Sequence, residues 1–349
     1  MNTRQICFFF IAFMPVLKIF AMPSALVRNA DNDLLFVYAL SFLLDFAVLQ
    51  IVLFSVTDKK DLYSKLLFHV KSVPAKTVYL LYAAFFVIKC MFYASEQRVY
   101  IELSLYQTET HLLTFIPFFL FGFYIATKRI KAIARLSDVT AILSALSIIT
   151  LIVLSFSSGD YLSFSPVLNV NAKKLFKSFA ATLIWGGDAV YLLFMANELT
   201  FEKHARLKIS LAYLSSGVAV LLFLAVFYAI FGNVGKEKSF AFAEISAYSV
   251  FLSNTARFDY FAIFFMLMTS VVAATLPLFF STLCLKKAFD FKHGIIPALI
   301  PVSVIFVFIA VSDDKSNALL NSMYGFFPIL AAIFNFLLPT LSLFFKVKN

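Results

Sequence analysis

The chain of 349 residues is 62% hydrophobic and only 14% charged, and its mean hydropathy is +0.92. A soluble domain of this length carries far more charge on its surface, so the composition excludes an ordinary soluble protein. The net charge of +10 does not indicate nucleic-acid binding, because excess Lys and Arg in a membrane protein set its topology.

Apolar runs that can cross a bilayer recur along the chain and predict an all-α polytopic membrane protein. Hydropathy places ten spans at about 6–26, 34–56, 76–95, 112–127, 136–157, 176–197, 209–231, 257–283, 294–311 and 321–345. The first run could also be read as a cleaved signal peptide ending at AMPSA. Pro15 and Lys18 interrupt that run, which favours a retained first span.

An even number of spans puts both termini on one side of the membrane. With both termini in the cytoplasm, the inner connections hold about twice as many Lys and Arg residues as the outer ones. A basic cluster at 173–177 falls on the outer side and opposes this assignment, but the balance favours cytoplasmic termini.

Two connections are amphipathic. The segment 58–76 has an apolar stripe of Leu62, Leu66, Leu67 and Val70, which predicts a short helix on the cytoplasmic face. The segment 236–255 has a similar pattern, and we expect it to pack over the outer mouth of the protein.

The first and sixth spans are both interrupted. Pro15 removes a backbone donor from the first span. Gly186 and Gly187 weaken the sixth span, at about 1 kcal/mol each relative to alanine. Helix breaks at membrane depth are tolerated where neighbouring segments or a water-lined cavity satisfy the freed backbone groups.

These interruptions lie half a chain apart and divide ten spans into five plus five. An odd number of spans in each half forces the halves into opposite orientations, as in transporters whose midplane site forms between two discontinuous helices. We therefore expect one transmembrane domain over 1–349, with a first repeat at about 1–158 and a second at about 172–349.

Charges within spans are costly and are candidates for a functional site. Lys18 and Asp188 lie beside the two breaks, and a pair between them is expected. That pair would be either part of a ligand site or a structural ion pair that neutralises both residues. Half-helix ends can also hold the amino and carboxylate groups of a zwitterion.

Asp45 lies midway along the second span, and Lys89 lies past the middle of the third. One reading is that they neutralise each other. The other is that Lys89 supplies a fixed positive charge where sodium-coupled relatives bind a cation, which suits a proton-linked or uncoupled protein. Both residues are candidates for ion or proton coupling.

The candidate ligand site comprises the residues at the two breaks: Met14, Pro15, Lys18, Trp185, Gly186, Gly187 and Asp188. Trp185 would stack on a ligand or gate its path, although tryptophan is also common at membrane interfaces. The sequence has no hydrolase or phosphate-loop motif and no metal-ligand spacing of His or Cys. We therefore expect no catalytic residue, metal or cofactor.

The order and spacing of several stretches resemble the B subunits of spore germination receptors (the GerAB type), within the amino acid–polyamine–organocation permease superfamily. These stretches are TRQICFFFIAF (3–13), MPSALVRNADNDLLF (22–36), KRIKAIARLSDVTAIL (128–143), FSPVLNV (164–170), GGDAVYLLF (186–194) and NTARFDYFAIFF (254–265). The chain departs from the family in three ways. Met14–Pro15 replaces a glycine-rich break, Asp188 stands where Glu is expected, and the sixth span lacks a proline near its end.

The resemblance implies a LeuT-like fold with a site between helices 1, 3, 6 and 8. It also implies an amino acid germinant, A- and C-type partner subunits, and a location in the spore inner membrane. The alternatives are a stand-alone proton-coupled amino-acid permease and a scaffold subunit whose site is vestigial. The departures bear on the ligand more than on the fold.

Overall fold

The computed structural model describes residues 1–58, 60–69, 72–101, 112–164, 171–248, 259–311 and 325–344. Within these residues the chain is helical, and the only β-type contact is an isolated bridge between Asn2 and Thr200. The stretches 165–170 and 254–258, which carry part of the resemblance, lie outside the described residues. The all-helical fold class is confirmed for the described part of the chain.

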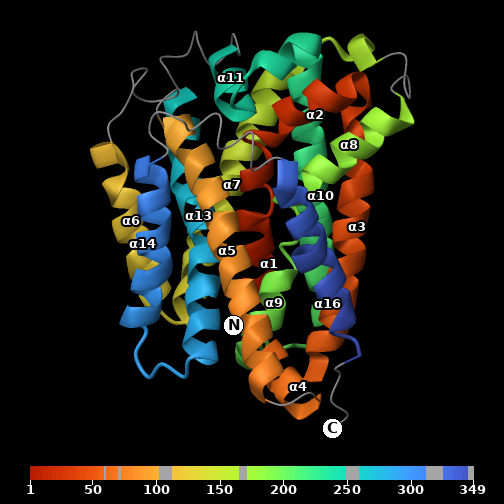
Figure 1. The fold of residues 1–349 in the computed structure, drawn as a ribbon. Coiled ribbons are helices and arrows are strands. Elements are labelled where there is room, and N and C mark those ends of the chain that lie inside the picture. The colour runs from red at the N-terminus through yellow and green to blue at the C-terminus, as the bar shows by residue number, and fades with distance from the viewer. Residues whose placement is uncertain are drawn as a thin grey trace.

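The long helices form an upright bundle, with short helices at its two ends (Figure 1). The α-helices are α1 (Thr3–Phe13), α2 (Met22–Ala30), α3 (Leu34–Ser55), α4 (Leu62–His69), α5 (Ser72–Ile101), α6 (Leu112–Thr127), α7 (Ile130–Ser155), α8 (Ala172–Thr182), α9 (Val190–Met195), α10 (Ala205–Phe231), α11 (Ala241–Tyr248), α13 (Asp259–Ala288), α14 (Ile295–Val311) and α16 (Leu338–Leu341). A π-helical stretch, Ala332–Leu337, precedes α16.

Several helical segments can cross a membrane. Six are long and apolar enough: Met22–Ser55, Ser72–Ile101, Ile130–Ser158, Ala172–Glu198, Ala205–Glu237 and Ile263–Ala288. Three shorter apolar helices are Phe115–Thr127, Ile295–Val311 and Gly325–Leu341. These segments identify a multi-pass integral membrane protein.

Helix α7 shows how this composition folds in a bilayer. Its inner face carries small polar residues, and the Ser144 hydroxyl lies 3.4 Å from the carbonyl oxygen of Ile11 on α1. Its outer face carries large apolar residues at helical spacing, such as Ile142, Leu146 and Ile149, each more than half exposed. Small residues inside let helices approach closely, and apolar residues outside suit lipid.

Both expected helix breaks are present, and they meet inside the bundle. Helix α1 is in the centre of the view in Figure 1 and contacts α7 and α10. The chain is non-α-helical between α1 and α2, and again between α8 and α9 apart from short 3₁₀ turns. The segments next to these breaks are buried, so other parts of the protein can satisfy their freed backbone groups.

The amphipathic segment α4 differs from its sequence prediction at Leu67 and Lys65, and Val70 of the predicted stripe lies outside the described residues. Leu62 and Leu66 are buried as expected, but Leu67 is 40% exposed. Lys65 points inward instead, and its ammonium donates to the Ser55 carbonyl at 2.6 Å and to the Ser55 hydroxyl at 2.9 Å. The reason is that the carbonyl at the end of α3 has no partner within its own helix, and the Lys65 ammonium supplies one.

The second amphipathic segment lies at the opposite end of the bundle, where Figure 1 shows α11 and α2. The part at 249–255 lies outside the described residues. In the described part, the backbone N–H of Ala241 donates to the Phe20 carbonyl at 3.0 Å. The start of α11 therefore satisfies one carbonyl of the first break and packs over it.

Candidate functional site

The first break places Lys18 in the interior. Helix α1 ends at Phe13, because Pro15 has no N–H to donate and its ring crowds the preceding turn. The chain then forms a 3₁₀ turn, Val16–Lys18, in which the Lys18 N–H donates to the Pro15 carbonyl at 3.1 Å. Met14, Pro15 and Lys18 are all buried, and Lys18 is only 3% exposed.

The second break depends on its two glycines. After a 3₁₀ turn at Leu183–Trp185, Gly186 is extended and Gly187 has a φ of +83° before the helix resumes at Val190. A Cβ atom on Gly187 would overlap the side chain of Asn335. Gly187 is therefore required both by its backbone conformation and by close packing.

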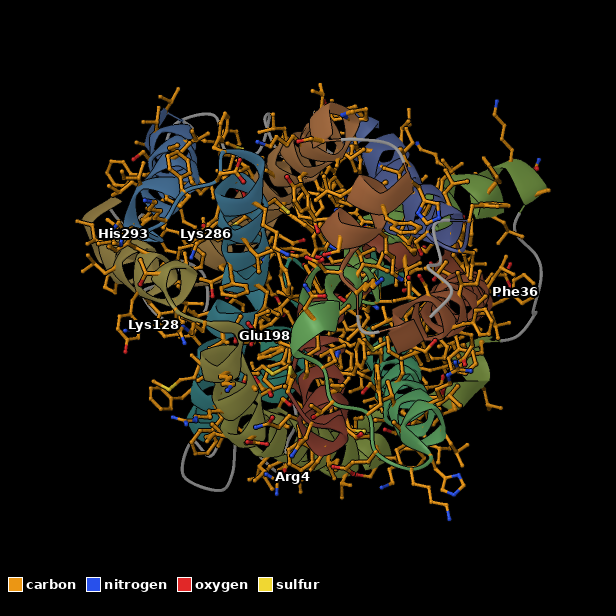
Figure 2. All side chains as sticks on the ribbon, turned by 90° about the horizontal axis from the view of Figure 1, so that it is seen from below. Arg4, Phe36, Lys128, Glu198, Lys286 and His293 are labelled. Atoms are coloured by element: carbon orange, nitrogen blue, oxygen red, sulfur yellow. The ribbon has the colours of Figure 1, made fainter. Side chains whose placement is uncertain are left out.

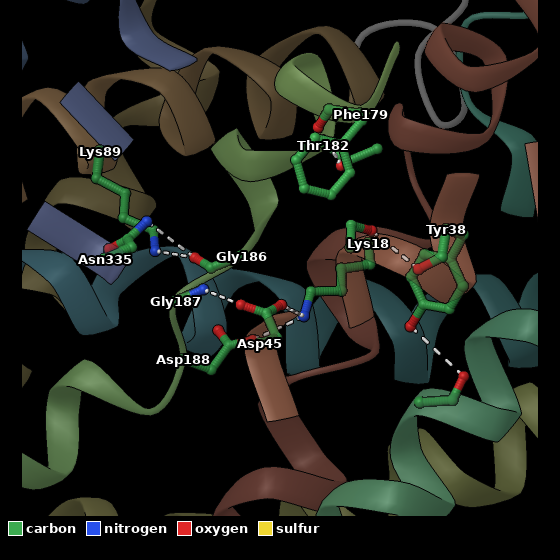
Figure 3. A network of polar contacts seen from close by, with 12 residues as sticks. Lys18, Tyr38, Asp45, Lys89, Phe179, Thr182, Gly186, Gly187, Asp188 and Asn335 are labelled. Carbon is green, nitrogen blue, oxygen red and sulfur yellow. Dashed lines mark hydrogen bonds and ion pairs between the residues drawn. The ribbon is translucent and has the colours of Figure 1, made fainter. Parts of the chain in front are cut away.

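One ion network joins the two breaks (Figure 3). The Lys18 Nζ lies 2.9 Å from Asp188 Oδ2 and 3.3 Å from Asp45 Oδ2. The other carboxylate oxygen of Asp45 accepts a hydrogen bond from the Gly187 N–H at 2.9 Å. Asp45 thus connects a cation from the first break with a backbone donor from the second.

A second pair of donors meets the same break from the opposite side (Figure 3). The Lys89 ammonium on α5 and the Asn335 amide both donate to the Gly186 carbonyl, at 2.9 and 3.0 Å. The Lys89 Nζ also lies 5.6 Å from the ring centroid of Tyr191 and 5.8 Å from that of Tyr93. The glycine carbonyl and aromatic faces therefore surround this buried cation.

The four ionisable residues at the breaks balance one another in charge. Lys18 and Lys89 contribute two positive charges, and Asp45 and Asp188 contribute two negative ones. Isolated charges at this depth would be strongly unfavourable, so a neutral, hydrogen-bonded set is the arrangement that a membrane interior tolerates. The side chain of Asp188 is 14% exposed, against 7% for Asp45 and 3% for Lys18, so Asp188 is the most accessible member of the ion network.

Trp185 lies next to the network but within an apolar environment. The residue is 1% exposed, and its ring meets that of Phe92 at 68°, with centroids 5.8 Å apart. It therefore packs against α5 at the start of the second break. Its expected role in stacking on a ligand or gating the path remains a prediction.

Aromatic residues lie on both sides of the network. Toward α11, Phe20 packs edge-on against Tyr100 with centroids 4.6 Å apart. Toward α9, Tyr191 stacks on Phe280 at 4.5 Å and meets Phe9 edge-on at 6.2 Å. Aromatic residues thus flank the network along the chain, since Phe20 lies two residues beyond Lys18 and Tyr191 lies three residues beyond Asp188.

Of the two charge pairings considered from the sequence, one is a direct contact in the structure. The Lys18–Asp188 pair is present. Asp45 and Lys89 form no direct ion pair in the described part of the chain, because Asp45 accepts from Lys18 and Gly187 while Lys89 donates to a carbonyl, so their mutual neutralisation stays a prediction. The second break leaves the Gly187 N–H and the Gly186 carbonyl without helical partners. Asp45 accepts from the N–H, and Lys89 donates to the carbonyl.

Asn335 has a larger part than its sequence context suggested. Its amide donates to the Gly186 carbonyl, and its side chain also occupies the space beside Gly187. It lies in the π-helical stretch, a feature frequent at functional sites. The only signal in the sequence was one amide within the apolar run AAIFNFLL (331–338).

The arrangement suits binding of a small polar molecule. The two breaks bring together opposite charges, backbone hydrogen-bonding groups and neighbouring aromatic rings such as that of Tyr191. Among the residues that the structure describes, no group of three or more His, Cys, Asp or Glu side chains could hold a metal ion.

A family model described as "Spore germination protein" matches residues 2–318 of the chain. The chain belongs to the spore germination protein family. The match covers both breaks and all four ionisable residues of the site, and it supports the GerAB-type assignment made from the sequence. A comparison with curated proteins gave no match.

Membership in the spore germination protein family agrees with the apolar helical bundle. It assigns the protein to permease- or receptor-type membrane proteins that act in germination. Asn335 lies beyond the matched residues, although its side chain contacts the second break.

Proposed function

We propose that this protein is the germinant-sensing B subunit of a spore germination receptor and binds a small zwitterionic amino acid between the two helix breaks. The proposal includes ten membrane spans in two inverted halves, at about 1–158 and 172–349. It also includes a site near the bilayer midplane between the first, third, sixth and eighth spans. A- and C-type subunits would be the partners, in the spore inner membrane, with both termini in the cytoplasm.

The Lys18–Asp188 ion pair is the observation that carries this proposal. A zwitterion brings one positive and one negative charge, so it can insert between these two side chains and leave the net charge of the network unchanged. One ion pair would be exchanged for two, with the ligand carboxylate toward Lys18 and its ammonium toward Asp188. A ligand with a net charge would unbalance a buried network, which is costly.

Two acceptors near the second break support this orientation of the ligand. Asp188 is the most accessible carboxylate of the network. The buried Oδ1 of Asn335 has no hydrogen-bond partner within the described residues. Each is suited to an ammonium donor, because a buried acceptor gains most from a charged donor.

The alternative function is a stand-alone proton-coupled amino-acid permease. It is favoured by the two further ionisable groups, Asp45 and Lys89, which are buried beside the same break. Uptake of an amino acid into proteoliposomes that contain this chain alone would support the permease. Ligand binding without such uptake would support the receptor subunit.

The test is thermal stabilisation of the purified chain in detergent by a panel of small amino acids, their methyl esters and their N-acetyl derivatives. We expect stabilisation by one or more zwitterions and none by the derivatives, which lack one charge. Asp188→Asn should weaken binding at least about tenfold. Asp138→Asn is the matched control. Asp138 also forms an ion pair, with Arg4 at 3.7 Å, but this pair does not involve the residues of the breaks. Equal binding to both variants would overturn the site.

A further inference from the structure

A second polar feature lies at the end of the bundle seen in Figure 2. A cavity of about 500 Å³ opens where α6 and α13 end and where α7 and α14 begin. Lys128, Lys286 and His293 lie toward one side of this end, and Glu198 lies nearer its middle (Figure 2). Because four apolar helices end or begin here, the cavity is at the depth of a membrane–water boundary.

The charges that line the cavity are unbalanced. Its lining contains five cations and two carboxylates. Lys287 already pairs with Asp61, and Asp290 pairs with Lys76, both partners lying outside the lining. The remaining cations form what we call the basic pocket: Lys128, Arg129, Lys286 and Lys292. Within the described part of the chain, none of these four forms an ion pair with a carboxylate.

Two helix N-termini add to this positive potential. Arg129 is the N-cap residue of α7 and makes no side-chain capping bond, and Gly294 directly precedes α14. Neither helix has an acidic residue in its first turn. The first N–H groups of a helix carry partial positive charge and bind anions, so the backbone reinforces the side chains here.

The sides of the cavity continue into lipid-facing surface. On α6, Leu120 is 65% exposed and Tyr124 is 58% exposed. On α14, Ile296 is 56% exposed and Leu299 is 47% exposed. The Lys128 ammonium lies 4.2 Å from the ring centroid of Tyr124, which links the basic pocket with the apolar surface. A ligand with an anionic head and apolar chains matches both parts.

We infer that the basic pocket binds the phosphate headgroup of an anionic phospholipid, whose acyl chains lie along α6 and α14. Basic pockets between transmembrane helices recognise such headgroups. The four cations and two helix N-termini supply the charge, and the cavity of about 500 Å³ gives a headgroup room to enter. This inference does not depend on the proposed function, because the pocket is built from other helix ends than the germinant site.

The experiment is native mass spectrometry of the full chain in a non-ionic detergent. Cardiolipin, phosphatidylglycerol, phosphatidylethanolamine and inorganic phosphate are added in separate titrations. We expect adducts with the two anionic lipids and much weaker ones with phosphatidylethanolamine. The double variant Lys128→Gln/Lys286→Gln should bind the anionic lipids at least about tenfold more weakly.

The matched control is Lys203→Gln/Arg206→Gln, which removes two exposed cations from the same end outside the pocket. It should bind anionic lipid as the unmodified chain does. Equal losses in the two double variants would show a general surface effect and overturn the pocket. Displacement of the lipid by millimolar inorganic phosphate would identify a soluble phosphate ligand and overturn the lipid assignment, as would equal binding of phosphatidylethanolamine.

Discussion

Lys18 and Asp188 form an ion pair, with Nζ 2.9 Å from Oδ2, although they are 170 residues apart in the sequence. Each belongs to one of the two helix breaks, so their contact joins the breaks directly. Asp45 extends the connection to α3 by accepting from both Lys18 and the Gly187 N–H. A ligand that changes this pair would therefore act on three helical segments at once.

The two carboxylates of the network should differ in their effect on stability. Asp45→Ala removes the acceptor of the Gly187 N–H as well as one partner of Lys18, and we expect a loss of about 3–5 kcal/mol in the free energy of unfolding. Asp188→Ala should cost less, because Lys18 keeps Asp45 as a partner. Thermal unfolding in detergent, followed by tryptophan fluorescence, measures both. A larger loss for Asp188→Ala would contradict these assignments.

The positions of the breaks could be predicted from the sequence because their causes are local. Pro15 removes a backbone donor and crowds the preceding turn of its helix, and adjacent glycines at 186 and 187 weaken any helix. The apolar composition likewise dictates helices in a bilayer, since a lipid-exposed backbone must satisfy its own hydrogen bonds. These features need no knowledge of what packs against them.

The partners of the charged residues could be predicted only in part. Lys18 and Asp188 adjoin the two breaks, so any fold that packs the breaks together brings them close. The carbonyl that Lys89 binds and the space that Asn335 fills depend on the exact path of the broken backbone. Hydropathy carries no information about that path, and the same holds for the inward turn of Lys65.

Gly187→Ala should destabilise the protein for two reasons that a control can separate. Its φ of +83° disfavours alanine, and the added Cβ would overlap Asn335. Gly232 also has a positive φ, of +49°, but open space surrounds its Cβ position. Gly232→Ala should cost about 1–3 kcal/mol from backbone strain alone, because a φ of +49° with a ψ of −136° disfavours residues with a Cβ, and Gly187→Ala should cost clearly more.

The double variant Gly187→Ala/Asn335→Gly tests the crowding directly. Removing the whole Asn335 side chain, including the Cβ and Cγ atoms that the added Cβ would overlap, should recover part of the loss, because the Cβ added at position 187 then has room. The interaction energy comes from a double-mutant cycle of unfolding free energies. If the two losses simply add, close packing against Asn335 is not why position 187 must be glycine.

Lys89 and Asn335 should compensate for each other, because both donate to the Gly186 carbonyl. Asn335→Leu leaves that carbonyl bonded to Lys89, and Lys89→Met leaves it bonded to Asn335. The double variant leaves the buried Gly186 carbonyl without either side-chain donor, which adds about 1–3 kcal/mol to the sum of the single losses. Denaturation of all three variants gives the cycle, and an additive or smaller combined loss would refute the shared carbonyl.

The orientation in the membrane gives a prediction that separates the two ends of the bundle. The excess of Lys and Arg favours cytoplasmic termini, while the basic cluster at 173–177 opposes it. Lys174 at the start of α8 and Lys203 before α10 are both exposed, and they fall on opposite sides in the proposed topology.

In a background with Cys7, Cys90 and Cys284 replaced by alanine, Lys174→Cys should react in intact cells with a membrane-impermeant maleimide. Lys203→Cys should react only after permeabilisation, because its connection would face the cytoplasm. The reverse pattern would show that the protein has the opposite orientation, with the basic pocket at the outer surface. Labelling of both sites in intact cells would contradict an odd number of spans between them.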